Sequence, residues 1–460
     1  MVRQKRVLIG IVAVLVASAA VAGGALDFAW LKGVTDKNPL FYEAGEEMVF
    51  TLTLEDLEGA VPEGAFRLKW KRTGDDGVTE EGVEPVNGAP FVYRTRLGKP
   101  GFVRLYAEVV DAKTGRTFTK KFTGDATTPD GRRAMNRFEK RPRTLFFDGG
   151  AGVGIDTLQA RPEPDDFDAF WERQRARLAK IPMKAERIKV GETTNVTIYA
   201  VQVDCAGTRP MTGYLTVPRG AEAGAAKFPC QLFMHGYVYR APHVAPADGP
   251  ANRIRLDINA HGMRLPAFGA DAAYYKRFGA EIRTKGPGQD AYAFNTEENA
   301  DPEVAYFNGM VLRIMRALQY LKSLPEWNGA DLWAEGASQG GLQTIWAAAC
   351  GEGVTKAEAT IPWCCDLGGE LIGRNRGTWF IPWADGLGYY DPVNFAKRIP
   401  KSCRTEICRA GLGDYICPPS GVAILWNNIP GNKKIRWVQG STHGYVAPVD
   451  YPGRDIVRED

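Results

Sequence analysis

The sequence predicts an α/β protein in which a mostly parallel sheet follows a small antiparallel β-sandwich of immunoglobulin-like type. In residues 36–125, apolar and polar residues alternate in short runs separated by turn signals, as in strands with one buried face. From residue 164 onward, continuous apolar runs alternate with segments of helical periodicity, which is typical of a parallel sheet covered on both faces by helices. A chain of 460 residues is also too long for one ordinary core, so two folded units are expected.

Residues 1–25 predict a signal peptide that precedes both units. Arg3, Lys5 and Arg6 form a basic start, residues 7–20 are apolar, and Ala20-Val-Ala22 is a small-residue cleavage site. An uncleaved membrane anchor is the alternative, but this apolar stretch is short for a bilayer crossing. We therefore expect export to the periplasm or the medium, with no stable membrane insertion after cleavage.

Charge and cysteine content exclude several classes of protein. Removal of residues 1–22 lowers the formal net charge from +4 to +1, which leaves no electrostatic case for nucleic-acid binding. The eight cysteines form no dense disulfide pattern; Cys403 could pair with Cys408 and Cys205 with Cys230, and buried free thiols are equally expected. With only four histidines, no His/Cys group has a convincing zinc spacing, so neither a metal nor another cofactor is expected.

The first unit, residues 26–125, shows the strand pattern most clearly in Met48, Phe50, Leu52 and Leu54, which alternate with Val49, Thr51 and Thr53. It contains no catalytic constellation, so we expect a spacer or lid, with carbohydrate binding as the alternative. Residues 126–163 contain Gly and Pro and are predicted to form a connector.

The second unit, residues 164–455, begins with a helix capped near Pro164-Asp-Asp166. Further helices are predicted at residues 304–322 and 418–428. Strands are predicted at residues 196–204, 212–217, 228–234, 253–259, 357–363, 406–411 and 434–438.

The strongest chemical signal is Gly336-Ala-Ser-Gln-Gly340, which follows a short apolar strand and precedes a helix at residues 339–350. Such a Gly-x-Ser-x-Gly turn is a nucleophile elbow, in which small neighbours allow a tight bend that exposes the serine hydroxyl. The pentapeptide alone occurs by chance, but its strand and helix context identifies Ser338 as the candidate nucleophile.

A serine needs a base, and the base needs a carboxylate that holds its tautomer. In hydrolases with this elbow, the chain order is Ser, then acid, then His. His443 is the one histidine after Ser338, and it follows the last predicted strand. Asp414 follows the strand at residues 406–411 and is the expected acid, with Asp366 after the preceding strand in reserve.

The oxyanion of acyl transfer needs backbone donors. The N–H of Gln339, directly after the nucleophile, is one expected donor. The N–H of Tyr237 in His235-Gly-Tyr237, after the apolar strand at residues 228–234, is the other. His235 itself is expected to shape this loop, and His261 either lines the pocket or packs its own loop.

These pieces resemble the acetyl xylan esterase and cephalosporin C deacetylase family of α/β-hydrolases. The similarity spans about residues 160–450 and rests on five motifs: Asp166-Phe-Asp-Ala-Phe-Trp171, His235-Gly-Tyr237, Gly336-Ala-Ser-Gln-Gly-Gly341, Gly413-Asp-Tyr-Ile-Cys-Pro-Pro419 and the His443 loop. The resemblance implies a metal-free serine esterase that removes acetyl groups from xylan-type sugars, with Ser338, Asp414 and His443 as triad and Tyr237 and Gln339 as oxyanion hole.

The chain departs from the family pattern at two motifs. Ala260-His-Gly262 stands where the family usually has Arg-Gly-Gln, and His443-Gly444 where it usually has His-Glu. The first departure leaves open which residues support the pocket, and the second removes a carboxylate beside the base. The sandwich also lies outside the family pattern, so acetyl xylan specificity and oligomeric state do not carry over directly.

Two other functions fit parts of the sequence. A peptidase of the prolyl-oligopeptidase type shares the triad order, but it usually carries a propeller that the short sandwich cannot form. A non-catalytic carbohydrate-binding protein with a hydrolase fold would lack a triad residue, and none is missing. The aromatic residues between two late strands could stack on sugar rings or belong to the core; they are Trp363, Trp379, Trp383, Tyr389 and Tyr390.

Overall fold

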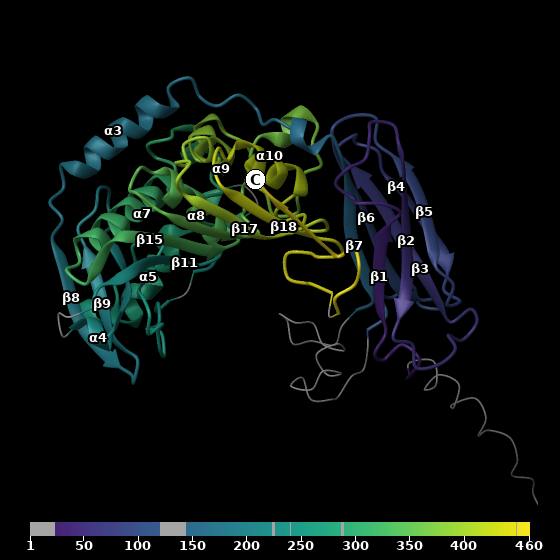
Figure 1. The fold of residues 1–460 in the computed structure, drawn as a ribbon, viewed down its shortest axis with the longest axis horizontal. Coiled ribbons are helices and arrows are strands. Elements are labelled where there is room, and N and C mark those ends of the chain that lie inside the picture. Colours follow the sequence, from purple (N-terminus) through teal and green to yellow (C-terminus); the bar gives the residue numbers. More distant parts are fainter. Residues whose placement is uncertain (1–23, 120–143, 223–225, 240, 287–288, 448) are drawn as a thin grey trace, which may run out of the picture.

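The computed structural model describes residues 24–119, 144–222, 226–239, 241–286, 289–447 and 449–460 (Figure 1). The described residues leave out the basic start, apolar stretch and cleavage site of the predicted signal peptide. They also leave out residues 126–143 of the predicted connector. Among the described helices, none has both the length and the apolar character needed to cross a membrane.

The amino-terminal part is a sandwich of two antiparallel sheets, as predicted. One sheet has the order β1-β2-β5 and the other the order β4-β3-β6-β7. Phe50, Leu68, Leu105 and Phe147 from both sheets form one buried core. The strands are β1 (Trp30–Thr35), β2 (Glu47–Glu55), β3 (Phe66–Gly74), β4 (Glu80–Pro85), β5 (Phe91–Arg96), β6 (Gly101–Asp111) and β7 (Phe146–Val153).

Strand β7 lies within residues 126–163, where a connector was expected. It pairs antiparallel with β6, from Gly101 opposite Val153 to Glu108 opposite Phe146. Its sequence, Phe-Phe-Asp-Gly-Gly-Ala-Gly-Val, has the Asp and Gly content that disfavours strands, so local propensity pointed to a loop. Burial of Phe147 and pairing along β6 outweigh that propensity, and β7 is part of the sandwich rather than a linker.

The remaining chain folds around a ten-stranded sheet with the order β19-β18-β17-β16-β15-β11-β12-β10-β9-β8. The six strands from β12 through β18 are parallel, and antiparallel strands extend both edges. This is the predicted α/β-hydrolase sheet. Its strands are β8 (Ala185–Glu192), β9 (Val196–Val203), β10 (Met211–Pro218), β11 (Phe228–Met234), β12 (Ile254–Ile258), β15 (Trp327–Ala337), β16 (Lys356–Thr360), β17 (Arg404–Gly411), β18 (Lys433–Val438) and β19 (Asp455–Glu459).

Helices α7 (Tyr306–Ser323), α8 (Gln339–Ala349) and α10 (Pro419–Asn428) lie on the same side of this sheet, above the strands in Figure 1. The apolar positions of α7 at helical spacing, Val311, Ile314, Met315 and Leu318, are fully buried there. The other helices are α3 (Phe167–Ala179), α4 (Arg219–Glu222), α5 (Ala272–Ile282), α6 (Thr296–Ala300) and α9 (Pro392–Ala396), with 3-10 turns at Ile155–Thr157, Pro266–Phe268, Gly369–Ile372 and Asp385–Tyr389 and a short hairpin of β13 (Thr284–Gly286) and β14 (Gln289–Ala291).

Coverage of the sheet by helices on both faces was wrong for the strands near its β19 edge. Along β16, β17 and β18, buried residues alternate with partly exposed ones such as Glu358, Glu406 and Arg436. The chain after β18 forms the edge strand β19 instead of a covering helix. Charged pairs, including Lys356 with Glu358 at 2.8 Å, make the exposed face compatible with water.

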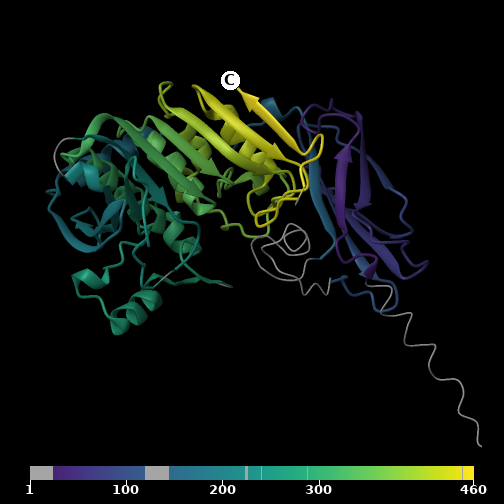
Figure 2. The ribbon, with the colours of Figure 1, turned by 60° about the horizontal axis from the view of Figure 1, so that its bottom comes forward.

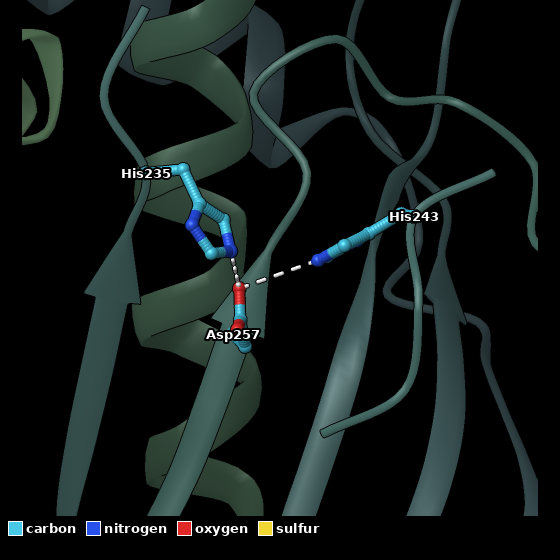
Figure 3. A group of neighbouring side chains, drawn as sticks. All are labelled: His235, His243 and Asp257. Carbon is cyan, nitrogen blue, oxygen red and sulfur yellow. Dashed lines mark ion pairs between the residues drawn. The ribbon is translucent and has the colours of Figure 1, made fainter. Parts of the chain in front are cut away.

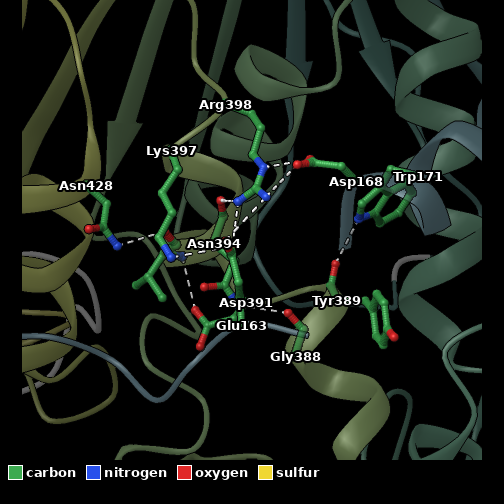
Figure 4. Close-up of polar contacts among 11 residues, drawn as sticks. Glu163, Asp168, Trp171, Gly388, Tyr389, Asp391, Asn394, Lys397, Arg398 and Asn428 are labelled. Atoms are coloured by element: carbon green, nitrogen blue, oxygen red, sulfur yellow. Dashed lines mark hydrogen bonds and ion pairs between the residues drawn. The ribbon is translucent and has the colours of Figure 1, made fainter. Parts of the chain in front are cut away.

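Helix α3 is anchored to the segment around α9 by polar contacts (Figure 4). The Arg398 guanidinium donates to Asp168 at 2.8 and 2.9 Å and to Glu163 at 2.5 Å. The indole N–H of Trp171 donates to the carbonyl of Tyr389 at 3.1 Å. Helix α3 is therefore held against the rest of the α/β-hydrolase unit by these hydrogen bonds and ion pairs.

The assignment of β7 to the sandwich core predicts that Phe147→Ala lowers the free energy of unfolding by about 3–5 kcal/mol, because a fully buried aromatic ring is lost. Phe41→Ala is the matched control; its ring is 50% exposed, and we expect a loss below about 1 kcal/mol. Urea unfolding followed by tryptophan fluorescence measures both values. Equal losses in the two variants would contradict the placement of β7.

Candidate active site

Ser338 lies in the turn between β15 and α8, in a strained backbone conformation. Its φ is 59° and its ψ −118°, a region that residues other than glycine rarely occupy. The Ser338 N–H donates to the carbonyl of Thr360 at 2.9 Å, and its carbonyl accepts from the N–H of Trp363 at 3.1 Å. These bonds hold the turn against the loop after β16.

Three glycines make this turn sterically possible. A β-carbon on Gly340 would lie 2.2 Å from the Met234 carbonyl oxygen, and one on Gly336 would lie 2.5 Å from the carbonyl oxygen of Gly340. A β-carbon on Gly341 would lie 2.9 Å from the Cα of Pro362. The Gly-x-Ser-x-Gly-Gly pattern thus reflects direct backbone-to-backbone contact.

The imidazole of His443 bridges the serine and a carboxylate. Its Nε2 lies 3.0 Å from Ser338 Oγ, and its Nδ1 lies 3.0 Å from Asp414 Oδ2. The other Asp414 oxygen accepts from the N–H groups of Ile416 and Cys417, both at 3.1 Å. Since an ionised carboxylate only accepts, Nδ1 is the donor and Nε2 is left to accept from the serine hydroxyl.

Cys417 lies beside this group without competing with the serine. Its Sγ lies 3.7 Å from His443 Nδ1, and burial raises the pKa of the thiol well above its usual value. A thiol held neutral in this way is a poor nucleophile. All eight cysteines are free, so neither of the two pairings considered from the sequence is formed.

The predicted oxyanion donors lie against the nucleophile turn. A β-carbon on Gly236, just before Tyr237, would lie 3.8 Å from Ser338 Cβ. The Tyr237 ring stacks on Tyr292 at 4.0 Å, and its hydroxyl donates to the Tyr292 carbonyl at 2.8 Å. Gln339 is the first residue of α8, where a backbone N–H has no partner in the preceding turn of the helix.

His261 packs its loop rather than lining a pocket. Its side chain is buried, with Nδ1 2.7 Å from the Tyr306 hydroxyl and Nε2 3.1 Å from the Val238 carbonyl. Burial lowers the pKa of His261 to about 3, so the ring is neutral. Because a carbonyl only accepts, Nε2 is the donor, and His261 fixes the residue that follows Tyr237. The Ala260-His-Gly262 loop, which departs from the family's Arg-Gly-Gln, therefore still supports the loop that carries Tyr237.

His235, at the start of the loop that carries Tyr237, forms a cluster with Asp257 and His243 (Figure 3). His235 Nε2 lies 2.6 Å from Asp257 Oδ1, and His243 Nε2 lies 3.4 Å from the same oxygen. Burial opposes ionisation of Asp257, but the two imidazoles outweigh it and lower the pKa of Asp257 to about 2. Sequence reasoning found His235 but missed both partners, because neither His243 nor Asp257 belongs to a recognisable motif.

Among the described residues, two groups of side chains hold enough donors for a metal ion: His235 with His243 and Asp257, and Asp414 with Cys417 and His443. In the first, His235 Nε2 and Asp257 Oδ1 lie 2.6 Å apart. This distance is shorter than the roughly 3.3 Å between ligand atoms of a tetrahedral zinc site. In the second, the imidazole nitrogens contact the serine and the carboxylate. The first group is therefore held by a close ion pair, and the second is a hydrogen-bonded network.

Asp366, the reserve acid, lies elsewhere than His443. Its carboxylate pairs with Arg374 at 2.7 Å, and its backbone N–H donates to Asp391 Oδ1 at 3.1 Å. Burial raises the pKa of Asp366 to about 6 and that of Asp391 to about 7. The structure thus brings Asp414, and not Asp366, to the imidazole.

The aromatic residues proposed for sugar stacking differ in their burial and in their neighbours. Tyr390 and Trp363 are buried in the core. Trp379 is half-buried, and its ring lies 4.7 Å from that of Tyr237. Trp379 also lines a pocket beside the site, together with Trp363, Phe380, Ile416 and Pro418. Trp383 lies under Arg161, and Tyr389 packs on Phe170 of α3.

Comparison with known proteins gives the family. The model of the acetyl xylan esterase (AXE1) family matches residues 156–369 and 384–451. The chain belongs to this family. It is also 30% identical over 316 residues to the acetyl esterase Axe7A of Xylanibacter ruminicola, a match that covers 65% of this chain and 68% of that protein.

A solved structure of an acetyl xylan esterase shares the fold. An acetyl xylan esterase from Paenibacillus sp. R4 superimposes with a TM-score of 0.50 at 23% identity, covering 63% of this chain and 93% of that one. Acetyl xylan esterase 1 from Thermoanaerobacterium sp. JW/SL YS485 has a TM-score of 0.49 at 20% identity, covering 63% and 92%. The family match begins at residue 156, so strands β1 to β7 lie outside it.

The contact between Gly340 and β11 predicts that Gly340→Ala lowers kcat by more than about 10-fold. The new β-carbon would lie only 2.2 Å from the Met234 carbonyl oxygen, which forces the turn and Ser338 to move. Gly98→Ala is the matched control, since a β-carbon there meets no atom within 4 Å. Steady-state hydrolysis of p-nitrophenyl acetate and the thermal midpoint measure both variants. A fully active Gly340→Ala enzyme would show that the turn tolerates a side chain.

Proposed function

We propose that the protein is an exported serine esterase that removes acetyl groups from carbohydrates such as acetylated xylan or xylo-oligosaccharides. The observation that carries this proposal is the pair of 3.0 Å contacts of His443, one to Ser338 and one to Asp414. Membership of the acetyl xylan esterase family supports the substrate class.

In the proposed reaction, Ser338 Oγ attacks the acetyl carbonyl while His443 Nε2 takes the hydroxyl proton. The N–H groups of Tyr237 and Gln339 stabilise the oxyanion of the tetrahedral intermediate. His443 then gives its proton to the departing sugar oxygen, which leaves an acetyl-serine. A water molecule, deprotonated by the same imidazole, attacks this ester, and acetate and free Ser338 result.

Asp414 has two roles in this mechanism. Its bond to Nδ1 holds the tautomer in which Nε2 accepts a proton, and its charge stabilises the imidazolium that forms. The carboxylate is itself 1% exposed and is fixed by two backbone N–H groups. The triad geometry therefore does not depend on the carboxylate that other family members carry after the histidine.

We further propose that the chain consists of a cleaved signal peptide, the sandwich and the esterase unit. The basic and apolar start supports export, and the separate buried core of β1 to β7 supports a distinct amino-terminal domain. The sandwich then extends to β7 rather than ending at residue 125.

Substitution of the nucleophile tests the mechanism. Ser338→Ala should lower kcat on p-nitrophenyl acetate by more than about 1000-fold and abolish labelling by a fluorophosphonate probe, because only an activated serine reacts. Ser323→Ala, which changes an exposed serine of α7, is the control and should match the wild type. Turnover by Ser338→Ala at the wild-type rate would refute the assignment, and failure of the wild-type chain to label would favour a non-catalytic sugar-binding protein.

The half-buried Trp379 offers a test of sugar binding. If its ring stacks on the sugar, Trp379→Ala should raise KM for acetylated xylo-oligosaccharides by about 5-fold and change kcat on p-nitrophenyl acetate much less, since aromatic stacking contributes about 1 kcal/mol. Trp383→Ala is the matched control on a ring next to Arg161. Release of acetate from acetylated xylan, acetylated monosaccharides and feruloyl esters, assayed together, defines the substrate range. Equal effects of the two substitutions would exclude a specific role for Trp379.

A further inference from the structure

We propose that the sandwich is part of the catalytic unit: its buried ion pair Arg104–Asp148 and its strand β7 position the loops that carry Asp414 and His443 and set the electrostatic surroundings of the triad. The inference rests on the proposed function. It assigns roles to residues that lie before the start of the family match at residue 156. Arg104, Asp148 and their neighbours are positioning residues and do not touch the substrate.

Strand β7 lies directly against the loop that carries Asp414. A β-carbon on Gly413 would lie 1.9 Å from the carbonyl oxygen of Asp148, so only glycine fits at this position. A β-carbon on Gly150 would lie 3.0 Å from the carbonyl oxygen of Leu412. Figure 1 shows β7 as the strand of the sandwich that faces the segment following β18. The residue next to Asp414 is therefore in backbone contact with the sandwich.

The same strand also holds the loop that carries His443. The side-chain amide of Gln439 donates to the Gly150 carbonyl at 2.8 Å, and its oxygen accepts from the Gly150 N–H at 3.0 Å. Gln439 follows directly after β18 and lies four residues before His443. Gln439 is buried, so these two hydrogen bonds satisfy its side-chain amide and join the sandwich to the loop that carries His443. Figure 2 shows the end of the parallel sheet meeting the sandwich at this place.

A third contact fixes helix α10, which follows the Asp414 loop. Asp75 of the sandwich accepts from the Ser420 hydroxyl at 2.9 Å and from the Asn375 N–H at 2.7 Å. Its carboxylate also accepts from the N–H of Phe102 at 2.8 Å. The loop from Gly411 to Ser420 is thus held at both of its ends by the sandwich.

The ion pair places two opposite charges beside the triad carboxylate. Arg104 donates to both oxygens of Asp148, at 2.8 and 2.6 Å, and its guanidinium lies 4.3 Å from the centre of the Tyr415 ring. Asp148 is 3% exposed. Burial raises the pKa of Asp148 to about 6, although Arg104 opposes the rise, and the nearby negative charge of Asp414 adds to it. Asp148 contacts Gly413, the residue directly before Asp414, so the two carboxylates are neighbours across the boundary.

The buried phenols and the thiol around these residues carry no charge near neutral pH. Burial raises the pKa of Tyr106 and of Tyr415, which face the ion pair, and that of the Cys417 thiol, which faces His443. Three other titratable side chains lie nearby: Glu108 accepts from the Tyr106 hydroxyl at 3.2 Å, Asp75 faces Tyr415, and the Arg409 guanidinium donates to the His443 carbonyl at 2.9 Å. A substitution in the ion pair leaves these three residues in place. It therefore changes the charge beside Asp414 only through Arg104 and Asp148.

Removal of one member of the pair changes the charge beside the triad in different ways. In Asp148→Asn, the remaining positive charge of Arg104 opposes protonation of the imidazole, so the acid limb of the pH–kcat/KM profile moves to lower pH. In Arg104→Gln, loss of the guanidinium raises the pKa of Asp148 further, so the buried carboxyl is protonated and uncharged across the acid limb, which stays near its wild-type position. One unit charge about 12 Å away in a medium of effective dielectric constant about 20 gives a shift of about 1 pH unit.

The experiment measures pH–kcat/KM profiles on p-nitrophenyl acetate for the full chain, both single variants and the double variant Arg104→Gln/Asp148→Asn. We expect a downward shift in Asp148→Asn, an acid limb near the wild-type position in Arg104→Gln, and a return towards the wild-type profile in the double variant. Arg104→Lys keeps the charge and is the conservative control, with an unmoved limb. A merely structural role would lower stability in both single variants without a shift that is confined to Asp148→Asn.

An unmoved limb in Asp148→Asn, shifts of the same sign in both single variants, or a shift that persists in the double variant would overturn the inference. Should Asp148→Asn fail to fold by circular dichroism, Asp148→Ala, which also leaves the Arg104 charge uncompensated, takes its place and must show the same downward shift. Ser338→Ala measured alongside separates the two proposals. If it is inactive and the profiles do not move, only the role of the sandwich fails; if it is active, the proposed function fails as well.

Discussion

The geometry of the site depends on the close approach of backbone atoms around Ser338. The turn between β15 and α8 sits so tightly on the end of β11 and on residues 360–362 that a β-carbon at Gly340 or Gly341 would overlap backbone atoms. This packing forces Ser338 into its positive φ and presents its hydroxyl at the carboxyl edge of the sheet. A strained conformation persists only where the surroundings determine it, and here two neighbouring strands do so.

The order of the parallel strands explains why residues far apart in the chain meet at this hydroxyl. Strand β15 lies between β11 and β16, and β17 and β18 follow on the β16 side. Parallel strands end at the same edge, so the loops after β11, β15, β17 and β18 open towards one another. These loops carry Tyr237, Ser338, Asp414 and His443, respectively. The carboxyl edge supplies four different groups because each comes from a separate strand.

The sandwich gives this family member a second set of constraints on the same loops. Contacts from β6, β7 and the β3–β4 turn reach the segments on either side of Asp414 and the start of the His443 loop. A shared boundary of this kind differs from a flexible tether, because backbone atoms of the two units touch at Gly413. Buried polar groups at the boundary are paired across it, so separation of the units would leave them unsatisfied in a dry environment.

The sequence by itself determined the parallel sheet, its helices and the candidates for the reacting residues, because these depend on local periodicity and on a motif with steric meaning. The Gly-x-Ser-x-Gly turn requires small residues wherever it occurs, and the order Ser, Asp, His narrows the remaining choice to His443 and to Asp414 or Asp366. Distances between loops decide that last choice, and only the tertiary structure contains them: it brings Asp414 to His443 and pairs Asp366 with Arg374.

Tertiary structure also decided the features that local sequence patterns do not predict. Strand β7 has the composition of a loop and becomes a strand through pairing with β6 and burial of Phe147. His243 and Asp257 belong to no motif and meet His235 through the fold. Arg104 and Asp148 lie more than 260 residues before Asp414. Long-range pairing and burial of charge depend on three-dimensional neighbours, and a linear pattern carries no information about those neighbours.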